Sequence, residues 1–392
     1  MPPSTTNARR PISLDMIETL IGFPTVSRDS NLDLIYFIRD TLADQGVESL
    51  IVPDDSGRKA NLYATLGPTD RPGICLSGHT DVVPVDGQDW DSDPFQLTER
   101  DGRLYGRGTA DMKGFVAIAM AMVPTFLSRE LETPIHLAFS YDEEIGCIGV
   151  RGLLAKLDAM PIKPSACIVG EPTSMKPVIG HKGKRSVRVH VRGLEGHSSL
   201  AHQGVNAVHF AADAIAFLHQ MARDKRKNGP FDQTFDPPYT TVHIGTIQGG
   251  TALNIVPRDC MFEFEFRHLP VEDPNELFAE FESHVRDVLE PEMRQVDANA
   301  GFRFEEMSTI AGLDTEEDDP TVTLTKVLAG ANDTGKVAFG TEGGLFQKIG
   351  IPTVVCGPGS IEQAHKPNEF IEIEQVLRCE DFMHKLCERV AA

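Results

Sequence analysis

The sequence predicts an α/β protein in which a mainly parallel mixed sheet flanked by helices forms one large domain that carries an inserted α+β domain. The chain has 392 residues, which is too long for one ordinary hydrophobic core, so two lobes are expected. Short apolar runs alternate with helical patterns over the first half, as is typical of a parallel sheet covered by helices. This alternation of strands and helices is replaced by a different order of elements between residues 184 and 292 and resumes after residue 292. We therefore predict one domain from residues 1–183 and 293–392, interrupted by a second domain at 184–292.

The elements of the first domain follow from hydrophobic periodicity and from the Gly, Pro and charged residues at their ends. One expected helix stops at Gly46, where a left-handed cap suits glycine. The expected helices are 14–21, 32–42, 111–127, 150–157, 321–328 and 372–390. The expected strands are 49–52, 61–66, 73–77, 135–141, 166–169 and 353–356. Because ligands bind at the carboxyl ends of parallel strands, polar residues just after these strands are the first site candidates.

The inserted segment has a different order of elements. A strand at 186–191 is followed by a long helix at 206–223, and two strands at 240–247 and 255–266 are followed by a helix at 275–289. This β-α-β-β-α order predicts a small α+β sandwich.

Composition and charge exclude several classes of function. The net charge of -21 would repel a phosphate backbone, so we expect no nucleic-acid partner. The longest apolar run, 115–127, is too short to span a bilayer, and the N-terminus lacks the apolar core of a secretion signal. Seven cysteines without any CxxC spacing argue against a disulfide framework or a thiolate zinc site. A cytoplasmic protein without a membrane segment is therefore expected.

Two motifs place candidate ligands in the first half of the chain. In SGHTDVVP, His79 and Asp81 follow an apolar run, and the Asp81 carboxylate can hold the His79 ring so that one nitrogen faces a metal. In GRGTADMKGF, Asp111 precedes a helix among three glycines, and its oxygens can bridge two cations. Taken alone, the first motif is also compatible with an ordinary turn and the second with a helix N-cap.

Three more motifs end strands further along. In FSYDEEIGC, Glu143 and Glu144 are adjacent and face opposite ways, so one can ligate a metal while the other acts as a general base. Glu171 in IVGEPTS and His365 in GPGSIEQAHKPNEF also follow strands. Each is singly compatible with a solvated turn or loop. Together, nitrogen and carboxylate donors at one rim of a sheet favour Zn²⁺, Co²⁺ or Mn²⁺ in an open catalytic site.

In this order and spacing, the motifs closely resemble those of the dizinc aminoacylase and carboxypeptidase family, which includes acetylornithine deacetylases and succinyl-diaminopimelate desuccinylases. The resemblance covers nearly the whole chain. The segments that carry it are SGHTDVVPVDGQDWDSDPF (77–95), LYGRGTADMKG (104–114), DEEIGCIG (142–149), GEPT (170–173), GHKG (180–183) and GPGSIEQAHKPNEF (357–370).

The resemblance implies that Asp111 bridges two Zn²⁺ ions, for which Co²⁺ is a possible substitute. His79 and Glu171 would complete one site, and Glu144 and His365 would complete the other. These are family roles, carried over to the positions of this sequence that match the motifs.

The remaining roles are implied in the same way. Glu143 would be the general base, and Asp81 would support the first histidine ligand. The inserted domain resembles the lid and dimerisation domain of the family, so a homodimer is expected. In GLEGHSS, His197 matches a histidine that stabilises the oxyanion, often across the dimer interface, while Asn254 and Arg267 match positions that contact substrate or shape the lid.

Within the family, SGHTDVVPVDGQDW, GEPTSMKP and GTEGGLF (340–346) are most similar to acetylornithine deacetylases. This likeness implies a small N-acyl amino acid as substrate, with N-acetyl-L-ornithine hydrolysed to L-ornithine and acetate in arginine biosynthesis by a water that the two cations activate. Glu342 either complements the cationic side chain of ornithine or is a helix-capping or supporting carboxylate. A desuccinylase, a general aminoacylase, and a dipeptidase or carboxypeptidase stay open, and a non-catalytic metal-binding scaffold is the alternative from another class.

Overall fold

The computed structural model describes residues 9–392 and divides into two compact units. Unit 1 comprises the chain up to Gly180, Leu313–Gly335 and Thr341–Ala392, and unit 2 comprises His181–Gly312 and Lys336–Gly340. Residues 1–8 lie outside the described residues. The start of the predicted first domain and part of the N-terminal stretch in which no secretion signal was expected fall there. Within residues 9–392, every helix falls short of the length or apolar character that a bilayer span requires.

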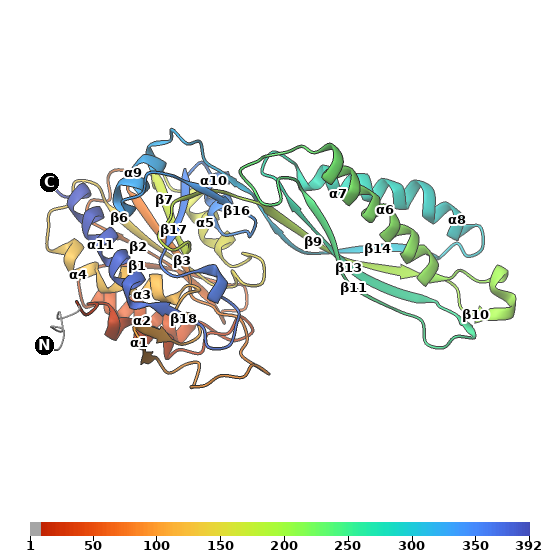
Figure 1. The fold of residues 1–392 in the computed structure, drawn as a ribbon, viewed down its shortest axis with the longest axis horizontal. Coiled ribbons are helices and arrows are strands. Elements are labelled where there is room, and N and C mark those ends of the chain that lie inside the picture. The colour runs from red at the N-terminus through yellow and green to blue at the C-terminus, as the bar shows by residue number, and fades with distance from the viewer. Residues whose placement is uncertain (1–8) are drawn as a thin grey trace, which may run out of the picture. The chain divides into compact units, whose positions relative to one another are not determined.

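Unit 1 is built on a large mixed sheet (Figure 1). Its strands are β1 (Ser49–Pro53), β2 (Ala60–Leu66), β3 (Ile74–His79), β6 (Ile135–Ser140), β7 (Ala166–Pro172), β8 (Val178–His181), β15 (Leu313–Asp314), β16 (Gly335–Val337) and β17 (Thr353–Gly357). Their order is β1-β2-β6-β3-β7-β17-β8-β15, with β16 beside β8. The central strands β6, β3, β7 and β17 run parallel to one another, which confirms the predicted α/β class. A small separate sheet joins β4 (Thr98–Arg100), β5 (Arg103–Tyr105) and β18 (Phe370–Glu372).

Helices cover the large sheet. They are α1 (Leu14–Ile21), α2 (Leu32–Ala43), α3 (Lys113–Ala121), α4 (Val123–Leu127), α5 (Val150–Asp158), α9 (Pro320–Ala329), α10 (Gly343–Lys348), the short η3 (Ile361–Gln363) and α11 (Ile373–Val390). The predicted helix 111–127 is split, because Pro124 lacks the N–H that a continuous helix needs. Gly170 lets α3 lie close against β7, since a Cβ there would lie 2.1 Å from the Phe115 ring. This close contact fixes the position of the loop that precedes α3.

Unit 2 is an antiparallel sheet with helices on one face. Its elements are β9 (Gly183–Arg192), β10 (Gly196–His197), η1 (Ser198–Gln203), α6 (Ala207–Asn228), β11 (Thr241–Gly249), β12 (Ile255–Val256), β13 (Asp259–His268), α7 (Pro274–His284), η2 (Val285–Leu289), α8 (Glu290–Arg294) and β14 (Gly301–Ile310). The main sheet has the order β11-β13-β9-β14, while β10 pairs with β12. Along β13 every second side chain is buried, from Cys260 to His268, and these residues include the phenylalanines that form the core.

The two compact units differ from the predicted division at residues 181–183, 293–312 and 336–340, all of which belong to unit 2, and the largest difference is at 293–312. Residues 293–312, which the sequence assigned to the first domain, belong to unit 2. The reason is β14, which pairs antiparallel with β9 as an edge strand of the unit 2 sheet. Its sequence, GFRFEEMSTI, alternates weakly and follows the expected end of the inserted segment, so no periodic pattern marked it as a strand.

Candidate metal centre

Four neighbouring strands of the unit 1 sheet carry the predicted ligands at their carboxyl ends. His79 is the last residue of β3, and Glu171 precedes the last residue of β7. Glu143 and Glu144 lie in the turn after β6, and His365 follows β17 and η3. Because β6, β3, β7 and β17 are adjacent and parallel, these side chains arise at one edge of the sheet, as the strand-end pattern predicted.

Asp111 lies at the middle of the group. Its Oδ1 is 3.1 Å from Nε2 of His79, and its Oδ2 is 3.2 Å from Nε2 of His365. One carboxylate thus faces two imidazoles through different oxygens. A carboxylate shared between two cations needs this arrangement.

The other carboxylates gather around the same histidines. Oε1 of Glu171 is 3.8 Å from Nε2 of His79, and Oε2 of Glu144 is 3.0 Å from Nε2 of His365. Donor atoms of His79, Glu143 and Glu171 lie within 4.8 Å of one another, and the same holds for His79, Asp111 and Glu144. The structure therefore brings together the five predicted ligands and Glu143.

The electrostatics of this group fit a bound cation. Burial, together with the nearby charge of Asp111, raises the pKa of Glu144 to about 7. Burial also raises the pKa values of Glu143 and Glu171 well above the usual range. Hydrogen bonds to Asp111 and Glu144 raise the pKa of His365 to about 10. Buried carboxylates crowd here with imidazoles as their neighbours, and nitrogen and oxygen donors of this kind suit Zn²⁺ or Co²⁺. The centre can hold metal ions.

Asp81 lies behind His79 and is itself held firmly. Ser27 Oγ donates to its Oδ2 at 2.7 Å, and the backbone N–H of Glu143 donates to its Oδ1 at 3.1 Å. Nδ1 of His79 lies 2.8 Å from the backbone carbonyl oxygen of Asp81 and 3.5 Å from its carboxylate. The nearer partner of the ring is thus the carbonyl, whereas the sequence predicted the carboxylate. In either case Nδ1–H donates, which leaves Nε2 free to bind a metal.

Glu369 shapes the loop that carries Asp111, and the sequence analysis did not single it out. Its Oε1 accepts hydrogen bonds from the backbone N–H groups of Gly108, Ala110 and Asp111 at 3.0, 2.9 and 3.1 Å. Its Oε2 lies 2.6 Å from a guanidinium nitrogen of Arg107, and both side chains are buried. Glu369 stands four residues after His365 in the same motif, but nothing in the sequence tells that it reaches a loop about 260 positions away.

The helix starts at α3 and α10 show whether Asp111 and Glu342 act as helix caps. Asp111 does not cap α3, because Met112 is the N-cap residue and makes no side-chain capping bond. Glu342 is only 1% exposed, and its Oε2 has no hydrogen-bond partner among the described residues. Its Oε1 accepts a hydrogen bond from Ser140 Oγ at 2.6 Å, and burial raises its pKa to about 7. Glu342 makes no helix-capping bond, and its contact with substrate stays a proposal beside the supporting role.

The other predicted site residues lie in unit 2. His197 and Asn254 are neighbours, since the Ser198 N–H donates to the Asn254 carbonyl at 3.1 Å and β10 pairs with β12. Arg267 pairs with Glu265 near the far end of β13, about 25 Å along the strand from Asp259. Within unit 2, Arg267 is therefore well separated from the other two residues.

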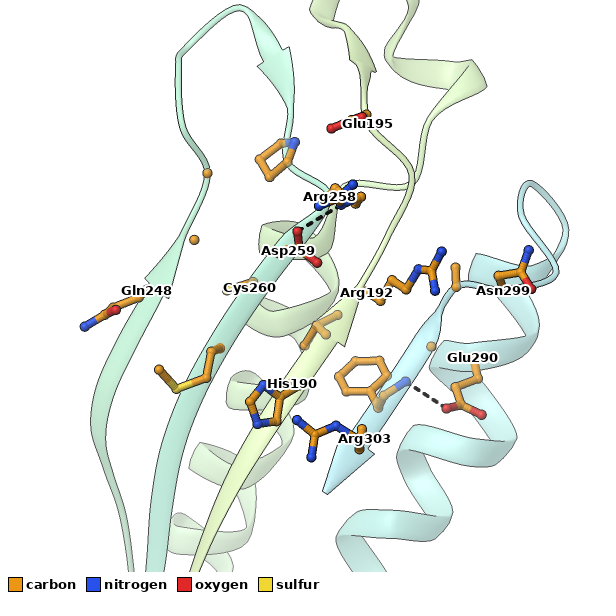
Figure 2. Close-up of a pocket in the computed structure, with 18 of the residues that line it drawn as sticks. His190, Arg192, Glu195, Gln248, Arg258, Asp259, Cys260, Glu290, Asn299 and Arg303 are labelled. Atoms are coloured by element: carbon orange, nitrogen blue, oxygen red, sulfur yellow. Dashed lines mark hydrogen bonds and ion pairs between the residues drawn. The ribbon is translucent and has the colours of Figure 1, made fainter. Parts of the chain in front are cut away.

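A hollow of about 840 Å³ opens in unit 2 at the end of the sheet (Figure 2). Arginines line it, but Arg258 pairs with Asp259, while Arg286 and Arg294 share Glu290. None of His197, Asn254 and Arg267 lines it. Among the described residues, the groups able to hold a metal ion both lie in unit 1. The hollow is therefore not the metal centre.

Comparisons with known proteins place this geometry in a family. A family model described as Peptidase family M20/M25/M40 matches residues 75–389. The chain belongs to this family. It is 34% identical to an acetylornithine deacetylase of Pasteurella multocida (strain Pm70), with 96% of this chain and 97% of the relative covered. It is 36% identical to an acetylornithine deacetylase of Shigella sonnei (strain Ss046), with 92% and 93% covered. This M20 protein is therefore a hydrolytic enzyme.

A solved structure agrees with the fold. The M20 family metallo-carboxypeptidase of Sulfolobus solfataricus matches with a TM-score of 0.75 over 96% of this chain and 98% of that one. The two sequences are 19% identical, so this likeness concerns the architecture. The resemblance read from the motifs is confirmed by these findings.

Proposed function

We propose that this M20 hydrolase cleaves the amide bond of N-acetyl-L-ornithine and releases L-ornithine and acetate, a step of arginine biosynthesis. Two relatives named as acetylornithine deacetylases match the chain nearly end to end. The observation that carries the chemistry is Asp111, whose two oxygens face His79 and His365 separately. With Glu171 beside His79 and Glu144 beside His365, the donors suffice for two cations.

The proposed cofactors are two Zn²⁺ ions, with Co²⁺ as a possible substitute. Bound cations would polarise the acyl carbonyl and make the attacking water more acidic. Metal analysis of the purified protein is expected to find two equivalents per chain. One equivalent, or none after purification without chelators, would contradict this part of the proposal.

Glu143 is the proposed general base. It takes the proton of the attacking water and returns it to the leaving amine, and burial raises its pKa well above the usual range of a glutamate. Glu143→Gln keeps the shape of the side chain but cannot accept the proton. We expect normal metal content and a fall in turnover of roughly 10²- to 10⁴-fold. Near-normal turnover would remove Glu143 from this role.

The substrate is tested by measuring acetate or succinate release from a panel of N-acetyl and N-succinyl amino acids, with and without added Zn²⁺ or Co²⁺. We expect kcat/KM to be highest for N-acetyl-L-ornithine. A clear preference for N-succinyl-diaminopimelate would change the assignment to a desuccinylase, and cleavage of dipeptides alone would make the protein a peptidase. Absence of hydrolysis with full metal content would favour the scaffold alternative.

We also propose a homodimer formed through unit 2. The edge strand β11 (TVHIGTIQG) contains no charged residue and no proline, the usual protection of an exposed strand edge. Ile247 on this strand is 51% exposed. Light scattering is expected to give twice the mass of one chain, and Ile247→Lys should shift it towards one chain. A monomeric wild type would contradict the dimer.

His197 is proposed to stabilise the oxyanion. Its Nδ1 accepts a hydrogen bond from the Ser199 N–H at 3.2 Å, which leaves Nε2–H exposed as a donor. His197→Ala should keep the metals bound but lower kcat, and an unchanged kcat would refute the role. Asn254 and Arg267 remain proposed substrate or lid residues. The proposed location is the cytoplasm, since all seven cysteines are free, and cell fractionation tests it.

A further inference from the structure

The thiol of Cys147 lies against the carboxylate of Glu143. Cys147 follows Glu143 by four residues, and its Sγ donates a hydrogen bond to Oε1 of Glu143 at 3.3 Å. The cysteine is fully buried, so the thiol itself is shielded from water, while Glu143 is partly exposed. A thiol is a weak donor, and in this buried place its direction is fixed by the chain around it.

The backbone of the turn delivers the thiol to this point. The N–H groups of Gly146 and Cys147 both donate to the Glu143 carbonyl oxygen at 2.8 Å, and the Ile148 N–H donates to the Asp142 carbonyl oxygen at 3.1 Å. Cys147 adopts a φ of 53°, in the left-handed region that glycine and asparagine occupy more easily. The backbone of this turn therefore points the Cys147 side chain back towards Glu143 at a position that would suit glycine better.

The Glu143 carboxylate has no other hydrogen-bond donor within residues 9–392. The other hydrogen bonds of this residue are made by its backbone, whose N–H donates to Asp81 and whose carbonyl oxygen accepts from Gly146 and Cys147. A glutamate side chain has three rotatable bonds, so a single directed contact decides where its oxygens point. With Oε1 bonded to the sulfur, Oε2 would be the oxygen left to accept a proton from the attacking water.

We propose that Cys147 is a positioning residue that holds the Glu143 carboxylate in the orientation needed for proton transfer. This inference rests on the proposed function, in which Glu143 is the general base. A weak donor suits the task because it orients the carboxylate while leaving most of its basicity for the water. Cys147 itself touches neither substrate nor water in this proposal.

The test compares three variants with the wild type, each loaded with Co²⁺ and assayed on the acetylated amino acid that is cleaved fastest. Cys147→Ala and Cys147→Gly remove the donor, and Cys147→Gly also relieves the left-handed φ, so its fold is not at risk from the backbone. We expect kcat to fall about tenfold in both, with KM within about twofold, as for a base that is held less accurately. Cys147→Ser retains a donor and should keep kcat within about threefold of the wild type.

Cys379→Ala is the matched control, because Cys379 is also fully buried but lies in the hydrophobic core of unit 1. It should keep kcat unchanged even if it lowers the thermal midpoint. Unchanged kcat in Cys147→Ala and Cys147→Gly would overturn the proposal, as would a Cys147→Ser variant as slow as Cys147→Ala. A sulfur-to-cobalt charge-transfer band that disappears in Cys147→Ala would also overturn it, since the sulfur would then be a ligand.

Glu143→Gln separates the two levels of the argument. If Glu143→Gln is nearly inactive while the Cys147 variants are normal, only the positioning role fails. If Glu143→Gln is as active as the wild type, the general base of the proposed function fails as well.

Discussion

Replacing Glu369 with glutamine tests whether a buried ion pair holds the metal-binding loop in place. The amide oxygen of glutamine can still accept from the N–H groups of Gly108, Ala110 and Asp111, which all reach Oε1 in the wild type. Its amino group would then face the guanidinium of Arg107, where two donors meet and neither is satisfied. Arg107 would keep its bond to Gln88 Oε1, at 2.7 Å, and little else.

The expected loss of stability follows from these contacts. Breaking a buried ion pair by removing one partner typically costs about 3–5 kcal/mol, and the retained Gln88 bond favours the low end of that range. Glu369→Ala also strands three backbone N–H groups and should cost about 2–3 kcal/mol more than Glu369→Gln. Because the Asp111 N–H is one of these groups, metal affinity should fall by roughly 10- to 100-fold.

Urea unfolding monitored by circular dichroism gives the stabilities, and competition with a chromogenic chelator gives the metal affinities. Glu372→Gln is the matched control, since this nearby carboxylate is about half exposed and lies 3.8 Å from Arg103, so its loss should cost less than about 0.5 kcal/mol. If Glu369→Gln stays within about 0.5 kcal/mol of the wild type and binds metal equally well, the loop does not depend on this ion pair.

Three further predictions concern other parts of the chain. Removing metal with EDTA should abolish hydrolysis and lower the thermal midpoint, because the carboxylates around Asp111 then repel one another. Restoring Zn²⁺ should reverse both effects. An unchanged thermal midpoint would contradict the binding of cations. Burial lowers the pKa of His136 from 6.5 to about 4, so the unfolded chain binds a proton before the folded chain does as the pH falls. Between pH 6.5 and 4 the free energy of unfolding of the wild type should therefore fall by up to about 3 kcal/mol relative to that of His136→Phe. An equal pH dependence of the two proteins in urea unfolding would refute this. Gly170→Ala should destabilise by roughly 2–4 kcal/mol because its Cβ would overlap the Phe115 ring, whereas Gly335→Ala meets open space; equal urea midpoints would contradict the packing argument.

Much of unit 1 was predictable because its strands and helices carry strong local patterns. The helix 14–21 and the strand 135–140 were expected within a residue of where they lie, since apolar spacing and flanking glycine or charge mark both ends. The metal-binding candidates were found for the same reason, since His79, Glu143, Glu144, Glu171 and His365 follow recognisable strands and Asp111 precedes a recognisable helix. By contrast, β14 and the short strands β4, β5 and β18 have weak or brief patterns, and only their pairing partners stabilise them.

Side-chain partners were the part that sequence could not supply. The resemblance implied that Asp111 lies between sites holding His79 and His365, but only the structure gave the contacts of its two oxygens with these rings. For Glu342 the sequence predicted either a substrate contact or a capping or supporting role, and only the structure showed its burial and its hydrogen bond from Ser140.

The sequence alone determined the α/β class, the family and the identity of the candidate ligands, because strand periodicity and motif spacing are local properties of the chain. The tertiary structure alone decided that Glu369 ties down the Asp111 loop, that Cys147 touches Glu143, and that β14 belongs to unit 2. Each of these contacts forms only when the folded chain brings the two groups within hydrogen-bonding distance, either across the sequence or around a turn. Such distances are a product of packing, and no spacing along the chain encodes them directly.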